Sequence, residues 1–142
     1  MTNNNNSTLV DADTQAKWFT NVRKAHQSET TEDYVELIAD LLEVNKEARL
    51  SDLAQRFGVS SPTASKILNR LKNEGYIESK PYRSIFLTKK GLELAKSCKE
   101  RHETVLNFLV RLGVPPEIAE FDAEGIEHHI SPETLEIFKE FK

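Results

Sequence analysis

Carboxylate and imidazole side chains lie close together at two places in the sequence, with spacings that could hold a metal ion. Asp33 and Glu36 are three residues apart, so both lie on one side of a predicted helix. Glu124, Glu127 and His128 repeat this geometry, because positions i, i+3 and i+4 converge on one helical face. Oxygen and nitrogen ligands without sulfur favour Mn²⁺ over softer ions. The four carboxylates of the two groups would also balance the charge of two divalent ions.

His102, on a predicted helix between these groups, would add a second imidazole. Copper and zinc bind such ligands more tightly than manganese, so geometry and metal availability would have to select Mn²⁺. Each part also has an ordinary interpretation. Asp33 and Glu36 favour the N-terminus of a helix, and an isolated His102 is commonly a solvated or core residue. Three separate segments with matching ligand types favour the metal site.

The overall composition limits the class of protein. The chain has 142 residues, 38% of them hydrophobic, and a formal net charge of −4. This size suits one compact unit or two small lobes and excludes a large multidomain enzyme. Apolar runs never exceed three residues, which predicts a cytoplasmic protein without a membrane span. Cys98 is the single cysteine, so an internal disulfide is excluded, and we expect it to pack rather than bind metal.

Charge is distributed unevenly along the chain. Residues 60–90 carry a net charge of +5, whereas residues 117–142 carry −6. A basic segment inside an acidic chain suggests a surface for phosphate, and the acidic segment suggests a cation. Two solvated faces remain the commoner explanation for charge by itself.

The N-terminal half of the sequence predicts a mobile tail followed by helices. Residues 1–14 lack apolar periodicity, and residues 15–27 predict a short docking helix. A further helix should begin after a capping hydroxyl at Thr30 or Thr31 and end near Asn45. The next helix should be capped by Ser51 and end at Gly58.

The following elements complete a recognisable order. Ser60 or Ser61 with Pro62 should open a third helix that runs to about Asn73. Residues 75–78 and 84–88 predict a β-hairpin. Helix, helix, tight turn, helix and hairpin is the order of a winged helix-turn-helix, in which the third helix enters the major groove and the hairpin is the wing.

The C-terminal part is predicted to be entirely helical. A long helix after Thr88 ends before Gly113 and suits a dimer spine. Pro116 begins a helix that extends to His128, and Ser131-Pro132 opens the last one. The predicted fold is therefore mainly α: an N-terminal extension over 1–29, a winged helix-turn-helix DNA-binding domain with a small β-hairpin wing over 30–90, and an all-α metal-binding and dimerisation domain over 91–142.

The exposed polar side chains of the third helix are candidates for groove contacts, and those of the wing for backbone or minor-groove contacts. On the helix they are Ser61, Thr63, Ser65, Lys66, Asn69 and Arg70, and on the wing Lys80 and Arg83 together with Tyr82. His129 is expected to face solvent or lie just outside the metal site, and His26 is assigned no role.

The chain from Glu32 to Phe138 resembles the manganese-responsive transcriptional regulators of the MntR type, a branch of the diphtheria toxin repressor-like metalloregulators. The resemblance rests on EDYVE at 32–36, GVSSPTASKILNRL at 58–71, RHE at 101–103 and DAEGIEHH at 122–129. The ligand pattern of that family matches this sequence at Asp33, Glu36, His102, Glu124, Glu127 and His128. Iron-sensing relatives carry Met and Cys where this chain has Asp33 and Glu124.

The resemblance implies a Mn²⁺-responsive repressor of metal-ion homeostasis genes that is not an enzyme. It would act as a homodimer on palindromic double-stranded operator DNA, with up to two ions per subunit, and Fe²⁺, Co²⁺, Zn²⁺ or Cd²⁺ could also bind. No membrane and no small organic substrate is expected as a partner. The alternatives are a winged-helix regulator that senses a small organic ligand and an iron-responsive member of the same family. A carboxylate–histidine metalloenzyme ranks last, because the basic helix would have no use in it.

Overall fold

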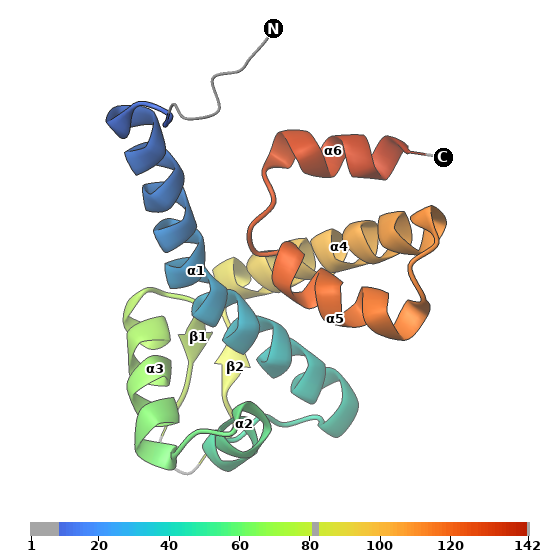
Figure 1. Ribbon diagram of the computed structural model, residues 1–142. Helices are drawn as coiled ribbons and strands as arrows, with labels where there is room; N and C mark the ends of the chain where they lie inside the picture. Colours follow the sequence, from blue (N-terminus) through green and yellow to red (C-terminus); the bar gives the residue numbers. More distant parts are fainter. Residues whose placement is uncertain (1–8, 81–82, 142) are drawn as a thin grey trace, which may run out of the picture.

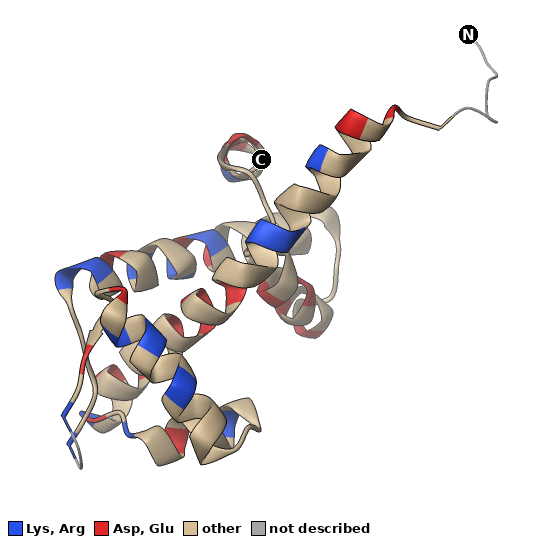
Figure 2. Cartoon of the chain, turned by 90° about the vertical axis from the view of Figure 1, so that its left-hand side faces the viewer, with Lys and Arg blue, Asp and Glu red and all other residues tan. Residues whose placement is uncertain are grey.

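The computed structural model describes residues 9–80 and 83–141 and shows two groups of helices joined by one long helix (Figure 1). That helix, α1 (Ala12–Asn45), crosses the whole molecule. Its C-terminal half packs against α2 (Leu50–Phe57) and the hairpin on one side and against α4 (Lys89–Leu112) on another. Its N-terminal half projects from the body in both views (Figures 1 and 2).

The first group is the predicted winged helix-turn-helix. Gly58, with a φ of +67°, ends α2 in the left-handed conformation that glycine adopts without steric cost. Ser60 then caps α3 (Ser61–Asn73), since its side chain accepts a hydrogen bond from the backbone N–H of Thr63. Strands β1 (Ile77–Glu78) and β2 (Phe86–Leu87) pair antiparallel, with Ile77 opposite Leu87.

One apolar core holds this group to α1. Tyr34, Ile38 and Leu41 recur on one face of α1 and are 4% exposed or less. They pack with buried side chains from α2, α3 and the hairpin, namely Leu53, Leu68, Leu71, Ile77 and Ile85. The position of α1 is therefore fixed relative to α3, the predicted recognition helix.

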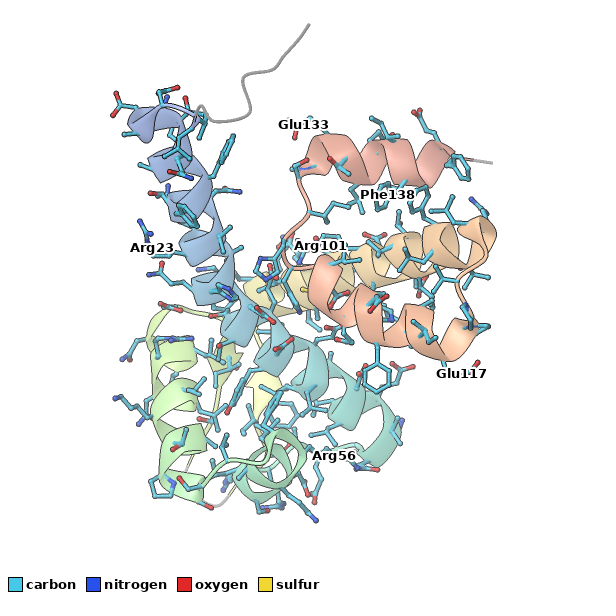
Figure 3. All side chains as sticks on the ribbon, viewed as in Figure 1. Arg23, Arg56, Arg101, Glu117, Glu133 and Phe138 are labelled. Carbon is cyan, nitrogen blue, oxygen red and sulfur yellow. The ribbon has the colours of Figure 1, made fainter. Side chains whose placement is uncertain are left out.

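The second group consists of α4, α5 (Pro116–Ile126) and α6 (Pro132–Glu140). Thr88 and Ser131 cap α4 and α6 through side-chain oxygens, as expected from the sequence for Ser131. Val105 on α4 is fully buried, as are Ala119 and Ala123 on α5. Phe138 points from α6 toward α4 (Figure 3) and stacks on Phe108 with ring centroids 3.8 Å apart.

Four expectations about helix ends were wrong. The helix that begins at Pro116 ends at Ile126, so Glu127 and His128 lie in the turn after it rather than within it. Thr30 and Thr31 cap no helix, because α1 continues through them from its N-cap at Asp11. The predicted tail likewise ends earlier: residues 12–14 are helical, and residues 1–8 lie outside the described part of the chain. Helix α2 starts at Leu50 rather than after Ser51. Among the described residues, no helix is both long and apolar enough to cross a membrane.

Candidate metal centre and DNA-binding face

The six predicted metal ligands lie where α1 meets the second group of helices. Helix α1 supplies two of them and α4 one, while the end of α5 and the turn that follows supply the rest. These residues are Asp33, Glu36, His102, Glu124, Glu127 and His128. In Figure 2, several segments coloured as Asp or Glu lie near the middle of the molecule. Residues far apart in the sequence therefore meet at one junction.

His128 forms one half of this junction. Its Nε2 lies 3.0 Å from Asp33 Oδ1 and 3.4 Å from Glu127 Oε1. Its Nδ1 lies 2.8 Å from Oε1 of Glu32, which accepts the hydrogen bond. An imidazole whose Nδ1–H is held by a carboxylate presents the lone pair of Nε2 to a metal, an arrangement typical of metal-ligating histidines.

His102 forms the other half in the opposite orientation. Its Nδ1 lies 3.2 Å from Glu127 Oε2 and 3.7 Å from Glu124 Oε1. Its Nε2 lies 3.0 Å from Oε2 of Glu120, which takes the same outer position that Glu32 takes for His128. Glu127 thus directs one oxygen toward each imidazole.

The buried polar atoms at the centre fit a cation. Glu127 is 1% exposed, yet neither of its carboxylate oxygens has a hydrogen-bond partner among the described residues. The same holds for Nε2 of His128 and Nδ1 of His102 within the described ranges. Buried polar atoms are normally paired, and orphaned ones in a native fold require an explanation. Here the four atoms are all metal-ligand types and face one another in two pairs, Glu127 Oε1 with His128 Nε2 and Glu127 Oε2 with His102 Nδ1, so bound divalent cations would satisfy them.

Two groups of the cluster, Glu127 and His128, have pKa values raised above their ordinary values. Burial raises the pKa of Glu127, and the negative charges of Glu36 and Glu124 raise it further, to about 8. Burial would lower the pKa of His128, but contacts with Asp33 and Glu32 outweigh it and raise this pKa to about 10. The junction therefore attracts positive charge, whether as protons or as a metal ion.

Glu36 belongs to the junction less directly than the other predicted ligands. It lines a shallow groove with Asp33 and Glu124, and burial together with the charge of Glu124 raises its pKa. It is not part of the tight groups of ligand atoms found among the described residues, one of which consists of Glu29, Asp33 and His128 and another of His102, Glu124 and Glu127.

Sequence reasoning assigned no role to Glu32, Glu120 and Arg101. Figure 3 places Arg101 at the centre, where α1, α4 and α5 meet, and its Nη2 lies 2.9 Å from Glu32 Oε2. Glu32 precedes Glu36, and Glu120 precedes Glu124, by one helical turn. This i, i+4 spacing was a signal that they share a face with the predicted ligands. Cys98 is fully buried, and burial raises the pKa of its thiol to about 12, in agreement with packing rather than ligation.

The predicted DNA-contacting residues lie on α3 and the wing. Figure 2 shows Lys and Arg along α3, at the hairpin and at the start of α4. One groove between α3 and the wing is lined by five of the predicted residues, Ser61, Ser65, Asn69, Lys80 and Arg83. Lys66 and Thr63 are exposed on α3 outside it. The same groove is lined by Arg49, Ser51, Lys72 and Ser79, which were not predicted.

Two of the predicted DNA-contacting side chains form hydrogen bonds within the protein. Arg70 Nη2 donates to Oγ1 of Thr31 on α1, 3.2 Å away, so it links the recognition helix to α1. Thr63 Oγ1 accepts from the Ser60 hydroxyl at the helix cap. Tyr82 lies outside the described residues.

Comparison with known proteins decides the family. Residues 26–85 match the family model described as iron dependent repressor, N-terminal DNA binding domain, and residues 88–141 match iron dependent repressor, metal binding and dimerisation domain. The chain belongs to the iron-dependent repressor family. Its members are transcriptional regulators rather than enzymes. The chain is accordingly a metal-responsive DNA-binding regulator whose partners are DNA and a second copy of the chain.

Relatives within the family include transcriptional regulators named MntR and a solved structure described as a manganese regulator. The chain is 52% identical to the transcriptional regulator MntR of Escherichia coli O6:H1 over 133 residues, which cover 94% of this chain and 86% of the relative. It is 51% identical to the MntR of Salmonella typhimurium, with 94% and 85% covered. A solved structure of the manganese regulator SloR superposes with a TM-score of 0.68 at 29% identity over 78% of this chain. Because that match covers 52% of the SloR chain, this chain spans about half of its length.

Proposed function

We propose that this member of the family is a Mn²⁺-responsive repressor of metal-ion homeostasis genes. The observation that carries the proposal is the buried Glu127 carboxylate, whose two oxygens face different imidazoles and have no hydrogen-bond partner among the described residues. The proposed ligands are the six residues predicted from the sequence. The 52% identity to a regulator named MntR supports Mn²⁺ over iron.

The two faces of Glu127 support two ions in each subunit. Its Oε1 belongs with His128 and Asp33, and its Oε2 with His102 and Glu124. Neighbouring ligands of an octahedral ion lie about 3 Å apart when the bonds are about 2.1 Å. Three of the separations between proposed ligand atoms are close to that value. They are 3.0 Å from His128 Nε2 to Asp33 Oδ1, 3.4 Å from His128 Nε2 to Glu127 Oε1, and 3.2 Å from His102 Nδ1 to Glu127 Oε2.

The location of the ligands explains how metal would control DNA binding. Asp33 lies one residue from Tyr34, which is part of the core beneath α3, whereas His102 and Glu127 belong to the second group of helices. When bound, divalent ions would neutralise the cluster and join the two groups. Without that compensation, Glu36, Glu124 and Glu127 repel one another across the junction.

The recognition helices of a dimer would then be held at a fixed separation. We propose that α3 and the wing contact the operator through the six α3 residues predicted above together with Lys80 and Arg83, in the major groove and on the adjacent backbone. Two such units related by a twofold axis would read half-sites of a palindrome about 34 Å apart. The predicted division at residues 30–90 and 91–142 places α3 and the wing in one domain and His102 in the other.

Metal-dependent DNA binding tests this function. The probe is a labelled duplex recovered by the Mn²⁺-loaded protein from a random-sequence library, and the readout is fluorescence anisotropy. We expect tight binding with Mn²⁺ and weak binding with EDTA, and Glu127→Gln should bind weakly even with Mn²⁺. Glu43→Gln, an exposed change on α1, serves as the control. Equal binding by the loaded and chelator-treated protein would favour the organic-ligand alternative instead.

A further inference from the structure

A second cluster of ligand-type side chains lies beside the metal centre, at the point where the projecting half of α1 passes the turn after α5. Glu29 Oε1 lies 3.4 Å from Nδ1 of His26 and 3.2 Å from Nε2 of His129. The two imidazole rings face each other edge to face, with centroids 4.9 Å apart. One ligand atom from each of the three residues lies within 4.8 Å of the other two.

We propose that His26, Glu29 and His129 form an additional metal site that takes a divalent ion with a preference for imidazole nitrogen, such as Zn²⁺. The site would join the N-terminal half of α1 to the segment that follows α5. It uses none of the six ligands proposed above, but it adjoins them, because a ligand atom of Glu29 also lies within 4.8 Å of ligand atoms of Asp33 and His128.

The separations in the cluster match a tetrahedral ion. Zinc is bound by His nitrogen and carboxylate oxygen at about 2.0 to 2.2 Å in tetrahedral geometry, which places neighbouring ligand atoms about 3.3 to 3.4 Å apart. The measured separations of 3.2 and 3.4 Å from the shared Glu29 oxygen require almost no rearrangement. Only the two imidazole nitrogens would have to approach each other.

The remaining coordination position is open to solvent. His129 lines a groove together with Lys24, Ser28 and Ser131, between α1 and the start of α6. The side chain of His26 is 64% exposed. Water can therefore complete the coordination of three protein ligands, as it does in zinc sites that are not closed by protein.

The ligand types distinguish this site from the main centre, by which we mean the six proposed ligands around Glu127. Its donors are two nitrogens and one oxygen, whereas the main centre offers four carboxylates and two imidazoles. Imidazole suits Zn²⁺ and carboxylate suits Mn²⁺. Because zinc also exceeds manganese in intrinsic affinity at most sites, the main centre can take zinc as well, so a test must count ions rather than detect binding.

The experiment is a count of Zn²⁺ bound by the full chain after equilibrium dialysis, compared with His26→Gln and His129→Gln. Gln27→Ala, an exposed neighbour of His26 on α1, is the matched control. His26→Gln is the decisive variant, because its side chain is largely exposed and lies on a different element from His128. Mn²⁺ equivalents are measured for the same proteins, so that a defect in the main centre is detected separately.

We expect each histidine variant to bind one Zn²⁺ equivalent fewer than the wild type, whereas Gln27→Ala binds the same number and Mn²⁺ equivalents do not change. Zn²⁺ should also slow amide hydrogen exchange over residues 12–29 in the wild type and not in His26→Gln. If His26→Gln retains the full number of Zn²⁺ equivalents, the additional site does not exist. Loss of Mn²⁺ equivalents in Glu127→Gln would still support the main centre in that case.

Discussion

Replacing Glu32 is expected to weaken Mn²⁺ binding, although Glu32 is not among the proposed ligands. Its Oε1 lies 2.8 Å from Nδ1 of His128, which leaves Nε2 of that ring facing Asp33. A carboxylate in this position fixes the tautomer of the imidazole and raises its basicity as a ligand. Glu32→Gln keeps an acceptor oxygen and removes the charge, whereas Glu32→Ala removes both.

The expected size of the effect follows from two opposing contributions. A divalent ion on Nε2 of His128 would lie about 6 Å from the Glu32 carboxylate, an attraction of about 5 kcal/mol at an effective dielectric constant of about 20. Much of this cancels, because Glu32 also stabilises the protonated imidazole and helps to raise the pKa of His128 to about 10. Arg101, 2.9 Å from Glu32, offsets a further part.

The net loss should therefore fall in the range found for carboxylates that support metal-bound histidines. We expect affinity for Mn²⁺ to fall about tenfold in Glu32→Gln and about 100-fold in Glu32→Ala, or about 1.4 and 2.7 kcal/mol. Glu32→Gln should also release fewer protons when Mn²⁺ binds at neutral pH, because the pKa of His128 is lower without the carboxylate. A role in packing alone would not change proton release.

The assay is a titration of free Mn²⁺ by its electron paramagnetic resonance signal, with circular dichroism to confirm folding. Glu43→Gln is the control, since it makes the same change at an exposed site on α1, about 16 Å further along the helix. If both Glu32 variants bind Mn²⁺ as tightly as Glu43→Gln does, the assignment of His128 Nε2 as a ligand atom loses its support.

Three further outcomes are expected. The metal-free protein should melt at lower temperature as the pH rises from about 6.5 to 8. The raised pKa values of Glu127 (about 8) and His128 (about 10) mean that the folded state holds protons that the unfolded state has already lost. A melting temperature that stays constant or rises over this pH range would contradict the prediction. Asp33→Met should lower affinity for Mn²⁺ relative to Fe²⁺ and Co²⁺, because a thioether replaces a hard oxygen ligand, and an unaltered order of metal affinities would remove Asp33 from the ligand set. Lys66→Ala should weaken operator binding several-fold and reduce its salt dependence by about one phosphate contact, whereas Lys139→Ala on α6 should not; an unchanged slope in a salt series would place Lys66 outside the interface.

The winged helix-turn-helix could be predicted from the sequence because its signals are local. The Ser60 cap, the Gly58 turn and the paired apolar runs around residues 77 and 86 each specify their own conformation within a few residues. The long helix after Thr88 and the last helix after Ser131 were predicted correctly for the same reason.

The continuity of α1 could not be predicted from capping residues. Thr30 and Thr31 resemble a helix start, but no Pro or Gly occurs between Ala12 and Asn45 to end the helix before them. The Ser28 hydroxyl donates a hydrogen bond to the backbone carbonyl of Lys24, 2.9 Å away, and the Thr31 hydroxyl oxygen accepts a hydrogen bond from Arg70. Polar side chains of this kind are tolerated within a helix when they find such partners.

The predicted metal ligands could be grouped by helical spacing, but their partners could not. The spacing of Asp33 and Glu36 is a property of the single helix α1, whereas Glu127 and His128 lie in the turn after α5, which keeps them near Glu124. The contacts of His128 with Glu32 and of His129 with Glu29 join positions about 100 residues apart in the chain. They depend on how α1 crosses the end of α5, which no local pattern encodes.

The coupling between metal and DNA is the most direct test of a metal-controlled link between the two groups of helices. It requires the affinity for Mn²⁺ with and without operator duplex, and the affinity for the duplex with and without Mn²⁺. We predict that each ligand strengthens binding of the other by the same factor, about 5- to 150-fold. If operator DNA leaves the affinity for Mn²⁺ unchanged, the ions do not hold the recognition helices in their DNA-binding arrangement.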